Sequence, residues 1–398
     1  MGGNLLPMKQ TTCSISTYSS DVFGVCSALF ELGGMIVMHD PSGCNSTYTT
    51  HDEPRWYDMD SQIYISGLTE LDAITGNDEK FIRNVAETAC AQKPAFIILT
   101  CTPIPLMIGT DFPALAKIIA RKTGIPTWSL PTNSMNTYVH GASLAFALLA
   151  RHLPAPVSSR KPASPSRLRV NLIGVTPLDF SSNGSDISLR RWLKQNNFLV
   201  QSCWAMGSSL SELQTSAAAD VSLVVSFSGL AAARILYERF GIPYVIGVPI
   251  GPLQSVIADA LQAAGRSSPC QPAWQNLPEQ NAGKKLCLIG ESIYMKSLAA
   301  AITLTSSCST NVICPLEADP ALLSQKDSCA KYETELIPLL QQADAVLADP
   351  LYGPICPKSA HFIPLPHEGF SGRLYRPEIP NLIRDFDSFI EGKLEPWD

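Results

Sequence analysis

Two apolar runs that are predicted to be buried strands are each followed by a cysteine, and these thiols are the residues best placed to do chemistry. Cys44 comes after Met35–His39 through the turn "DPSGC", and Cys101 directly follows Ala95–Thr100. Because the carboxyl ends of parallel strands meet at one edge of a sheet, we expect the two thiols to converge there. Cys13, in the loop before the first predicted helix, is a third candidate for the same edge.

The sequence alone leaves four uses of Cys44 open: a nucleophile, half of a disulfide, a metal ligand, or a small thiol packed under a loop. A nucleophilic thiolate needs a basic neighbour, which His39 or His51 would supply. Three cysteines from three loops, without a C-x-x-C pair, suit an iron–sulfur cluster better than zinc. Gly43 would let the backbone approach such a bulky group closely. Cys26 lies in the apolar helical pattern "VFGVCSALFEL", where a packed structural thiol is expected.

Composition narrows the class of protein. The chain has 398 residues, of which 45% are apolar and 16% charged, and its net charge is -6. It has no stripe of Lys and Arg, so nucleic acid is not an expected partner. No signal-peptide pattern and no long apolar stretch occur, so we expect a cytoplasmic protein that does not bind membranes. Neither a P-loop nor a G-x-G motif is present, so another protein is expected to handle any ATP or nicotinamide chemistry.

Short β-branched runs alternate with helical patterns, which is typical of α/β proteins with parallel sheets. In "KTGIPTWSL" and "RFGIPYVIG", a helix is predicted to end at Gly, which adopts the left-handed C-cap, before Ile-Pro leads into a strand. The predicted strands are Met35–His39, Ala95–Thr100, Arg169–Val175, Val221–Ser226, Tyr244–Gly247, Leu286–Gly290, Asn311–Cys314 and Ala345–Ala348, and predicted helices include Phe112–Thr123, Gly229–Phe240 and Ile293–Thr303.

Two segments rich in Pro and Ser, at 153–169 and 265–285, interrupt this alternation and have the composition of linkers. They predict three α/β units with parallel sheets, at residues 1–152, 168–265 and 284–398.

Several segments together resemble the nitrogenase component 1 family. This family includes the nitrogenase molybdenum–iron protein subunits, dark-operative protochlorophyllide reductase, chlorophyllide reductase and nickel-sirohydrochlorin reductase. "HDPSGC" (39–44) resembles the family's histidine–glycine–cysteine turn, with Asp40 where Gly is usual. The other similar segments are "ISGLTELDAITGNDEKF" (65–81), "LTCTPIPLMIGTDF" (99–112), "SLSELQTSAAADVSLVVS" (209–226) and "GLAAARILYERFGIPYV" (229–245).

The resemblance implies three Rossmann-like domains and a subunit of an ATP-dependent reductase. It implies an iron–sulfur cluster at a subunit interface, either a 4Fe–4S cluster or a P-cluster-like 8Fe–7S cluster. The implied partners are a homologous or identical component 1 subunit in a dimer or tetramer, a separate ATP-hydrolysing iron–sulfur reductase, and a small-molecule substrate. Electrons would pass from that reductase through the cluster to the substrate or to a second metallocentre.

The resemblance also implies roles for individual residues. Cys44 and Cys101 correspond to the family's second and third cluster ligands. The first ligand would fall near Ser19, and of the residues nearby we select Cys13. Asp21 is a lesser candidate, because oxygen ligation occurs among relatives.

The second and third predicted units carry the remaining candidates. Ser226 stands near the position where cofactor-binding nitrogenase subunits have a cysteine, so the resemblance does not imply nitrogen reduction. His367 falls near the segment that supplies the histidine of that cofactor, and it is our candidate catalytic residue together with Glu368. Two alternatives remain: a non-catalytic scaffold for metallocofactor assembly, and an α/β protein that binds a small molecule without any metal.

Overall fold

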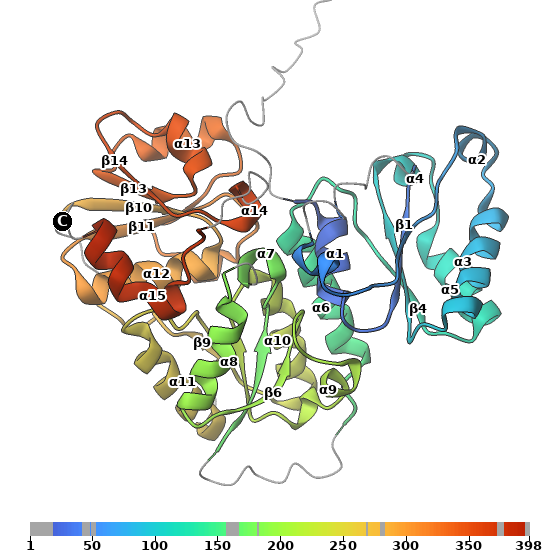
Figure 1. Cartoon of the computed structure of the whole chain (residues 1–398), viewed down its shortest axis with the longest axis horizontal. Helices are drawn as coiled ribbons and strands as arrows, with labels where there is room; N and C mark the ends of the chain where they lie inside the picture. Colours follow the sequence, from blue (N-terminus) through green and yellow to red (C-terminus); the bar gives the residue numbers. More distant parts are fainter. Residues whose placement is uncertain are drawn as a thin grey trace, which may run out of the picture. The chain divides into compact units, whose positions relative to one another are not determined.

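The structure is a computed structural model that describes residues 19–41, 48, 53–156, 167–180, 183–267, 270–278, 283–371 and 378–394. It is an α/β protein with three parallel sheets (Figure 1), which confirms the predicted fold class. Residue contacts divide the chain into two compact units, and each is described here by itself. The N-terminal unit comprises residues 19–246 and 257–271, and the C-terminal unit comprises residues 247–256 and the described residues from 272 onward.

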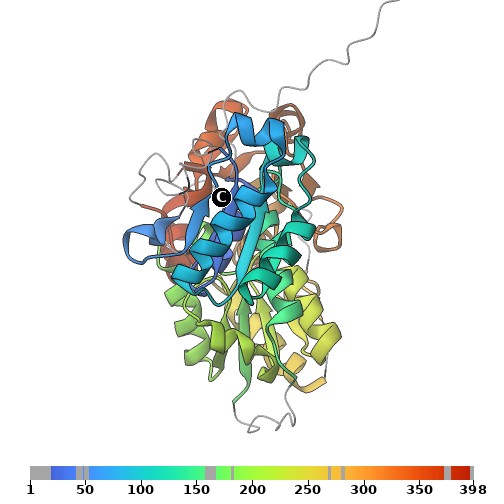
Figure 2. The same cartoon turned by 90° about the vertical axis from the view of Figure 1, so that its right-hand side faces the viewer.

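The first sheet of the N-terminal unit contains the strands that precede the candidate cysteines. Its strand order is β2-β1-β3-β4, and all pairs run parallel. Alternate residues of β1 and β3, including Met35 and Leu99, form one core with α3 and α5, which cover one face of the sheet (Figures 1 and 2). Its elements are α1 (Asp21–Leu29), β1 (Met35–His39), η2 (Pro54–Tyr57), β2 (Ile63–Ile65), α2 (Glu70–Thr75), α3 (Asp78–Gln92), β3 (Ile97–Cys101), α4 (Pro103–Met107), α5 (Phe112–Thr123), β4 (Thr127–Leu130) and α6 (Tyr138–His152).

The second sheet has the order β6-β5-β7-β8-β9, so the strand order reverses between β5 and β7. In open α/β sheets such a reversal is where ligands usually bind, beyond the carboxyl ends of the strands. Its elements are β5 (Arg169–Ile173), α7 (Pro177–Phe180), α8 (Ser185–Gln195), β6 (Leu199–Cys203), α9 (Leu210–Gln214), η3 (Ser216–Ala218), β7 (Val221–Val224), α10 (Phe227–Phe240), β8 (Tyr244–Ile246), α11 (Leu253–Ser267) and β9 (Gln271–Pro272).

The sheet of the C-terminal unit has the order β12-β11-β10-β13-β14, again parallel throughout. Its central strands are almost entirely buried, and half-exposed strands form its edges. Its elements are β10 (Lys285–Ile289), α12 (Ser292–Thr305), β11 (Ser309–Cys314), η4 (Pro320–Leu322), β12 (Ser328–Cys329), α13 (Glu333–Leu340), β13 (Ala345–Ala348), η5 (Pro350–Ile355), β14 (His361–Pro364), α14 (Glu368–Ser371), α15 (Leu382–Phe389) and η7 (Ile390–Leu394).

The predicted strands agree with the structure to within two residues at their ends. The two glycine-ended helices are also confirmed: α5 ends at Gly124 with φ 71° and α10 at Gly241 with φ 64°, and each leads into a strand after Ile-Pro. The three sheets lie within the ranges 1–152, 168–272 and 284–398. The domain boundaries at 1–152, 168–265 and 284–398 stay a prediction.

Candidate functional site

Cys101 ends β3 with its side chain inside the protein. The residue is 2% exposed, and it lies opposite His39 of β1 in the parallel register. Its Sγ is 2.6 Å from the carbonyl oxygen of Thr132 and 3.9 Å from that of Leu130. Burial raises the pKa of the Cys101 thiol, and the side-chain hydrogen bond with Thr132 opposes this only in part. The thiol is therefore protonated at neutral pH unless a cation or metal stabilises the thiolate.

Thr132 holds the backbone of Cys101 in place. Its hydroxyl accepts a hydrogen bond from the Cys101 N–H at 2.9 Å and donates one to the Cys101 carbonyl at 2.8 Å. Thr132 is itself fully buried in the loop after β4. One side chain thus satisfies both backbone groups at the point where β3 ends, which orients the thiol.

Asp21, the lesser candidate for the first ligand, binds the same loop. Its carboxylate accepts hydrogen bonds from the backbone N–H groups of Asn133 and Ser134 at 3.0 and 2.8 Å, and from the Asn136 side chain at 3.3 Å. Burial raises the pKa of Asp21 and these bonds oppose the rise. These contacts explain why a carboxylate is buried here without invoking a metal, and they tie α1 to the loop that carries Thr132.

The end of β1 is tied to the end of β3. The Thr102 hydroxyl donates to the Asp40 carboxylate at 2.5 Å, and both residues are buried. His39 packs against Phe81, with ring centroids 4.2 Å apart, and its Nδ1 is 2.8 Å from the Ser66 hydroxyl. Burial lowers the pKa of His39 to about 4, so this imidazole is neutral at physiological pH.

Three of the predicted site residues, Cys13, Gly43 and Cys44, lie outside the described residues. The last described residues before Gly43 and Cys44 are Asp40 and Pro41, which follow β1. Within the described ranges, no group of three or more His, Cys, Asp or Glu side chains is placed to hold a metal ion. Of the predicted set, the structure therefore locates Cys101 and the strand end that leads to Cys44.

The other described cysteines are free thiols, and most are packed in the interior. Cys26 is completely buried in α1, as predicted for a structural thiol. Burial raises the pKa of Cys203 and of Cys287 to about 12. Cys90, on α3, is exposed and gives a natural comparison for the buried cysteines.

Ser226 lies at the strand-order reversal of the second sheet, where β7 gives way to α10. It is buried, and its hydroxyl donates to the Gly174 carbonyl at the end of β5, at 2.7 Å. A Cβ at Gly174 would lie 2.5 Å from this hydroxyl. Ser226 therefore packs the two strand ends tightly together, and its oxygen is already hydrogen-bonded.

His367 and Glu368 lie in the C-terminal unit, at the start of α14 and just after β14. The His367 N–H donates to the buried carboxylate of Asp349, at 2.9 Å, and its Nδ1 accepts from the Gly369 N–H at 3.1 Å. The imidazole packs against Phe370. The structure thus places both residues at the carboxyl edge of the third sheet, where α/β proteins carry ligands.

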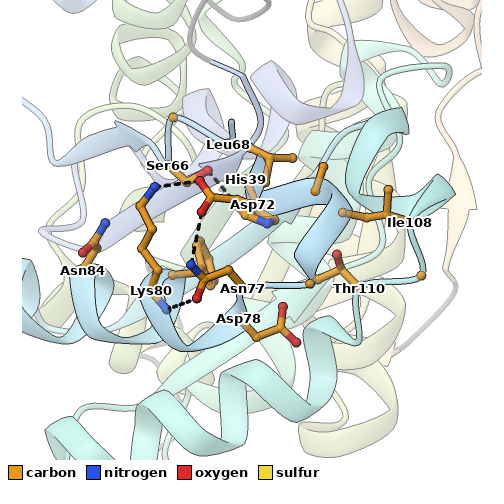
Figure 3. Close-up of a pocket in the computed structure, with 15 residues that line it drawn as sticks. His39, Ser66, Leu68, Asp72, Asn77, Asp78, Lys80, Asn84, Ile108 and Thr110 are labelled. Atoms are coloured by element: carbon orange, nitrogen blue, oxygen red, sulfur yellow. Dashed lines mark hydrogen bonds and ion pairs between the residues drawn. The ribbon is translucent and has the colours of Figure 1, made fainter. Parts of the chain in front are cut away.

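A cavity of about 100 Å³ lies beside His39, bounded by α2, the start of α3 and the residues after α4 (Figure 3). Asp72, Asp78 and Lys80 are the charged residues that line it, and Asp72 accepts hydrogen bonds from Lys80 at 2.6 Å and from Asn77 at 3.3 Å. The Lys80 bond, followed by the bond from Thr69, lowers the pKa of Asp72 to about 2. Polar side chains therefore line this cavity, and none of the described cysteines does.

Exposed apolar side chains gather on α2 and at the end of α4, the two elements that flank this cavity. Met107 is 85% exposed and Ile74 is 75% exposed. Exposed apolar side chains clustered in this way are typical of surfaces that bind another protein. The α2–α4 apolar patch, as we call it, consists of Leu71, Ile74, Leu106, Met107 and Ile108.

Sequence reasoning did not find Thr132, Thr102 or Asp40 as parts of this site. Each acts through a contact with a residue far away in the sequence, which no local pattern reveals. The one usable signal is position, since all three directly follow or closely follow strands that end at the same sheet edge. None of the described helices is long and apolar enough to span a membrane.

Comparison with known proteins defines the family. The family model "Nitrogenase component 1 type Oxidoreductase" matches residues 20–256, more than half of the chain, so the chain belongs to this family. The resemblance inferred from the sequence is thereby confirmed.

Similar curated proteins have two kinds of role. One is "Nitrogenase iron-molybdenum cofactor biosynthesis protein NifE" of Rhizobium meliloti, 25% identical over 46% of this chain and 38% of that protein. Another is a subunit of the light-independent protochlorophyllide reductase of Nostoc punctiforme, 26% identical over 57% of this chain and 49% of that protein. The matches thus span less than half the length of these relatives. The solved structure "Nitrogenase Cp1 at pH 6.5" has a TM-score of 0.68 at 13% identity, covering 98% of this chain and 95% of that one, which shows the fold alone.

Proposed function

We propose that this protein is a subunit of a nitrogenase-like, ATP-dependent reductase, in which Cys13, Cys44 and Cys101 hold an iron–sulfur cluster at a subunit interface. The observation that carries the proposal is the position of Cys101. Its buried thiol ends β3 directly beside the end of β1, from which the chain leads to Cys44. Membership of the oxidoreductase family supports this use of the thiols over a nucleophile or a disulfide.

Binding of Cys101 to an iron–sulfur cluster would replace the proton that its thiol donates to the Thr132 carbonyl oxygen. When bound, such a cluster accepts and releases single electrons at low potential. The contacts of Cys101 Sγ are two carbonyl oxygens and, at 3.9 Å, the Thr132 hydroxyl. Few hydrogen bonds to sulfur and an apolar environment keep the potential of thiolate-ligated iron low. Thr132 orients this ligand, and a glycine at position 43 would allow the backbone there to approach the cluster closely.

The α2–α4 apolar patch supports the proposed protein partners. It lies on elements that follow the β2 and β3 strands of the same sheet. A homologous or identical subunit, or the ATP-hydrolysing iron–sulfur reductase, would bury these side chains on docking. The relative from Nostoc punctiforme is, by its name, one subunit of a reductase, which favours a partner subunit here as well.

The proposed substrate-binding residues are His367 and Glu368, which follow the carboxyl end of β14 in the C-terminal unit; Ser226, at the carboxyl end of β7 in the N-terminal unit, is considered separately. His367 would bind or protonate the small-molecule substrate, and Glu368 would assist it with a carboxylate. Ser226 would line the site where cofactor-binding relatives hold their cofactor. Its hydroxyl donates to the Gly174 carbonyl, which supports a packing role more than a ligand role.

A scaffold for metallocofactor assembly is the second candidate. The match to a cofactor biosynthesis protein favours it, as does a serine at 226 with its oxygen already hydrogen-bonded. A scaffold would hold a cluster on the same thiols and release it to an acceptor protein.

Anaerobic purification, iron and sulfide counts, and EPR after dithionite reduction test the proposal. We expect a reducible cluster in the wild type and its loss in Cys44→Ala, while Cys90→Ala, at an exposed position of α3, retains it. A colourless wild-type protein without iron would refute both candidates. The scaffold would be favoured if the cluster transfers to an apo-acceptor protein and if an ATP-hydrolysing iron–sulfur reductase does not reduce it.

A further inference from the structure

Arg55 is a buried arginine in η2, where the described chain resumes after residue 52. It is 9% exposed. A guanidinium group has five N–H donors, and all five are used here. Nε and one Nη2 hydrogen bind the Glu53 carboxylate at 2.7 and 2.9 Å. The other Nη2 hydrogen binds the Ser27 carbonyl at 2.7 Å, and the Nη1 group binds Glu31 and the Ala205 carbonyl, both at 2.8 Å.

These contacts join two sheets within the N-terminal unit. Ser27 and Glu31 belong to α1 and the turn after it, whereas Ala205 follows β6 of the second sheet. Glu31 also accepts the backbone N–H of Gly207 at 2.7 Å. The turn after β6 is therefore held at two points by the same ion pair.

The turn itself has a backbone conformation that needs support. Ala205 has φ 90°, a region that residues with a side chain rarely adopt. Such conformations persist only where the surrounding contacts impose them. The carbonyl of this residue is the one that accepts the hydrogen bond from Arg55.

The other end of the ion pair reaches the chain that follows Cys44. The Tyr48 hydroxyl donates to the Glu53 carboxylate at 3.3 Å. Tyr48 is completely buried, and its ring stacks on Phe23 of α1 with centroids 5.3 Å apart. Burial acts to lower the pKa of Arg55, but its hydrogen bond and charge interaction with Glu53 outweigh this and raise the pKa above its ordinary value. Arg55 is therefore always charged.

We propose that Arg55 is a positioning residue: with Glu31 and Glu53 it forms a clamp that holds Tyr48 and η2 to α1 and to the turn at 205–207 of the second sheet. The Arg55 clamp would fix the proposed cluster site relative to the carboxyl end of β6. The consequence for the cluster rests on the proposed function, whereas the clamp itself does not.

Arginine is suited to this task because its planar fork satisfies several acceptors at once. A lysine keeps the charge but offers three donors from one nitrogen, so it cannot replace five separate hydrogen bonds. Removing one partner of a buried ion pair is strongly destabilising, because it leaves a buried charge unpaired.

The test compares Arg55→Lys and Glu31→Ala with Arg384→Lys, which makes the same substitution in the exposed pair between Arg384 and Asp385. Hydrogen–deuterium exchange of the Gly207 amide in the full chain reports on the clamp directly. We expect exchange about tenfold faster or more in both clamp variants, with β7 amides unchanged. Arg384→Lys should match the wild type throughout.

The EPR spectrum of the anaerobically purified protein is the second readout, because a purely structural contact would not change it. We expect Arg55→Lys to retain iron but to shift or broaden the cluster signal. Unchanged exchange at Gly207 in Arg55→Lys would overturn the clamp. Arg55→Gln decides this if Arg55→Lys does not fold, because Glu31→Ala removes the acceptor of the Gly207 amide itself. Faster exchange with an unchanged signal would overturn the positioning role. A wild type without iron would refute the proposed function, and the exchange data would still decide on the clamp.

Discussion

Replacing Thr132 with valine should loosen the end of β3 without changing the volume of the side chain by much. The substitution removes the hydroxyl that accepts the Cys101 N–H at 2.9 Å and donates to the Cys101 carbonyl at 2.8 Å. A buried N–H left without a partner costs about 1–3 kcal/mol, and loss of the second bond adds about 0.5–1.5 kcal/mol. The expected loss in the free energy of unfolding is therefore about 2–4 kcal/mol.

Thr100→Val is the matched control, at the position directly before Cys101 on β3. Thr100 is equally buried, but its hydroxyl makes a single long contact of 3.4 Å with the Val37 carbonyl. We expect this variant to lose less than about 1 kcal/mol. Both values follow from the urea midpoint of unfolding.

Alkylation of Cys101 in the folded, cluster-free protein, followed by peptide mass spectrometry, is the local readout for Thr132→Val. Local opening that is easier by about 2–4 kcal/mol should speed the reaction by about 30-fold to several hundred-fold, against little change in Thr100→Val. Equal unfolding midpoints for the two variants, or unchanged alkylation of Cys101, would refute the role assigned to Thr132.

Three further predictions concern residues around the site. Because burial lowers the pKa of His39 from its ordinary value to about 4, the unfolded chain binds more protons than the folded protein between about pH 4 and 6.5. Stability should therefore fall as the pH is lowered through this range, and His39→Phe should remove up to about 3 kcal/mol of that dependence, measured by urea unfolding at pH 7 and 4. An identical pH dependence in the variant would contradict this. Ala205→Gly should stabilise the protein by about 1 kcal/mol, seen as a higher Tm, because relief of the strain at φ 90° outweighs the added entropy of glycine in the unfolded chain; a lower Tm would contradict this. Ser226→Ala should lower the free energy of unfolding by about 1–2 kcal/mol through the lost bond to Gly174 while leaving the iron content unchanged, and a loss of iron would instead indicate a ligand role.

The core strands and the glycine-ended helices could be predicted from sequence because local patterns determine them. β1 is a continuous apolar run whose residues are all buried, and its predicted bounds are the observed ones. In contrast, β2, β6 and β14 are partly exposed, and their apolar runs are only two or three residues long. Edge strands are defined by pairing with a neighbour, which a local pattern does not encode.

The site could be predicted only in part, for a related reason. Cys101 stood out because a cysteine directly follows a buried strand. Thr132 and Arg55 did not, because each acts on groups that are distant in the sequence, such as the Ala205 carbonyl. A threonine in a loop and an arginine near a tryptophan are common, and only the folded chain shows that their donors are fully used.

The most direct measurement is the iron and sulfide content of Cys101→Ser compared with Cys90→Ser, both purified without oxygen alongside the wild type. Both variants replace a sulfur atom with oxygen. Cys101→Ser does so at the buried end of β3, and Cys90→Ser at an exposed position on α3. We expect iron and sulfide to be present in the wild type, retained in Cys90→Ser and lost in Cys101→Ser, while far-UV circular dichroism of all three remains the same. Equal iron content in the two variants, or none in the wild type, would contradict it.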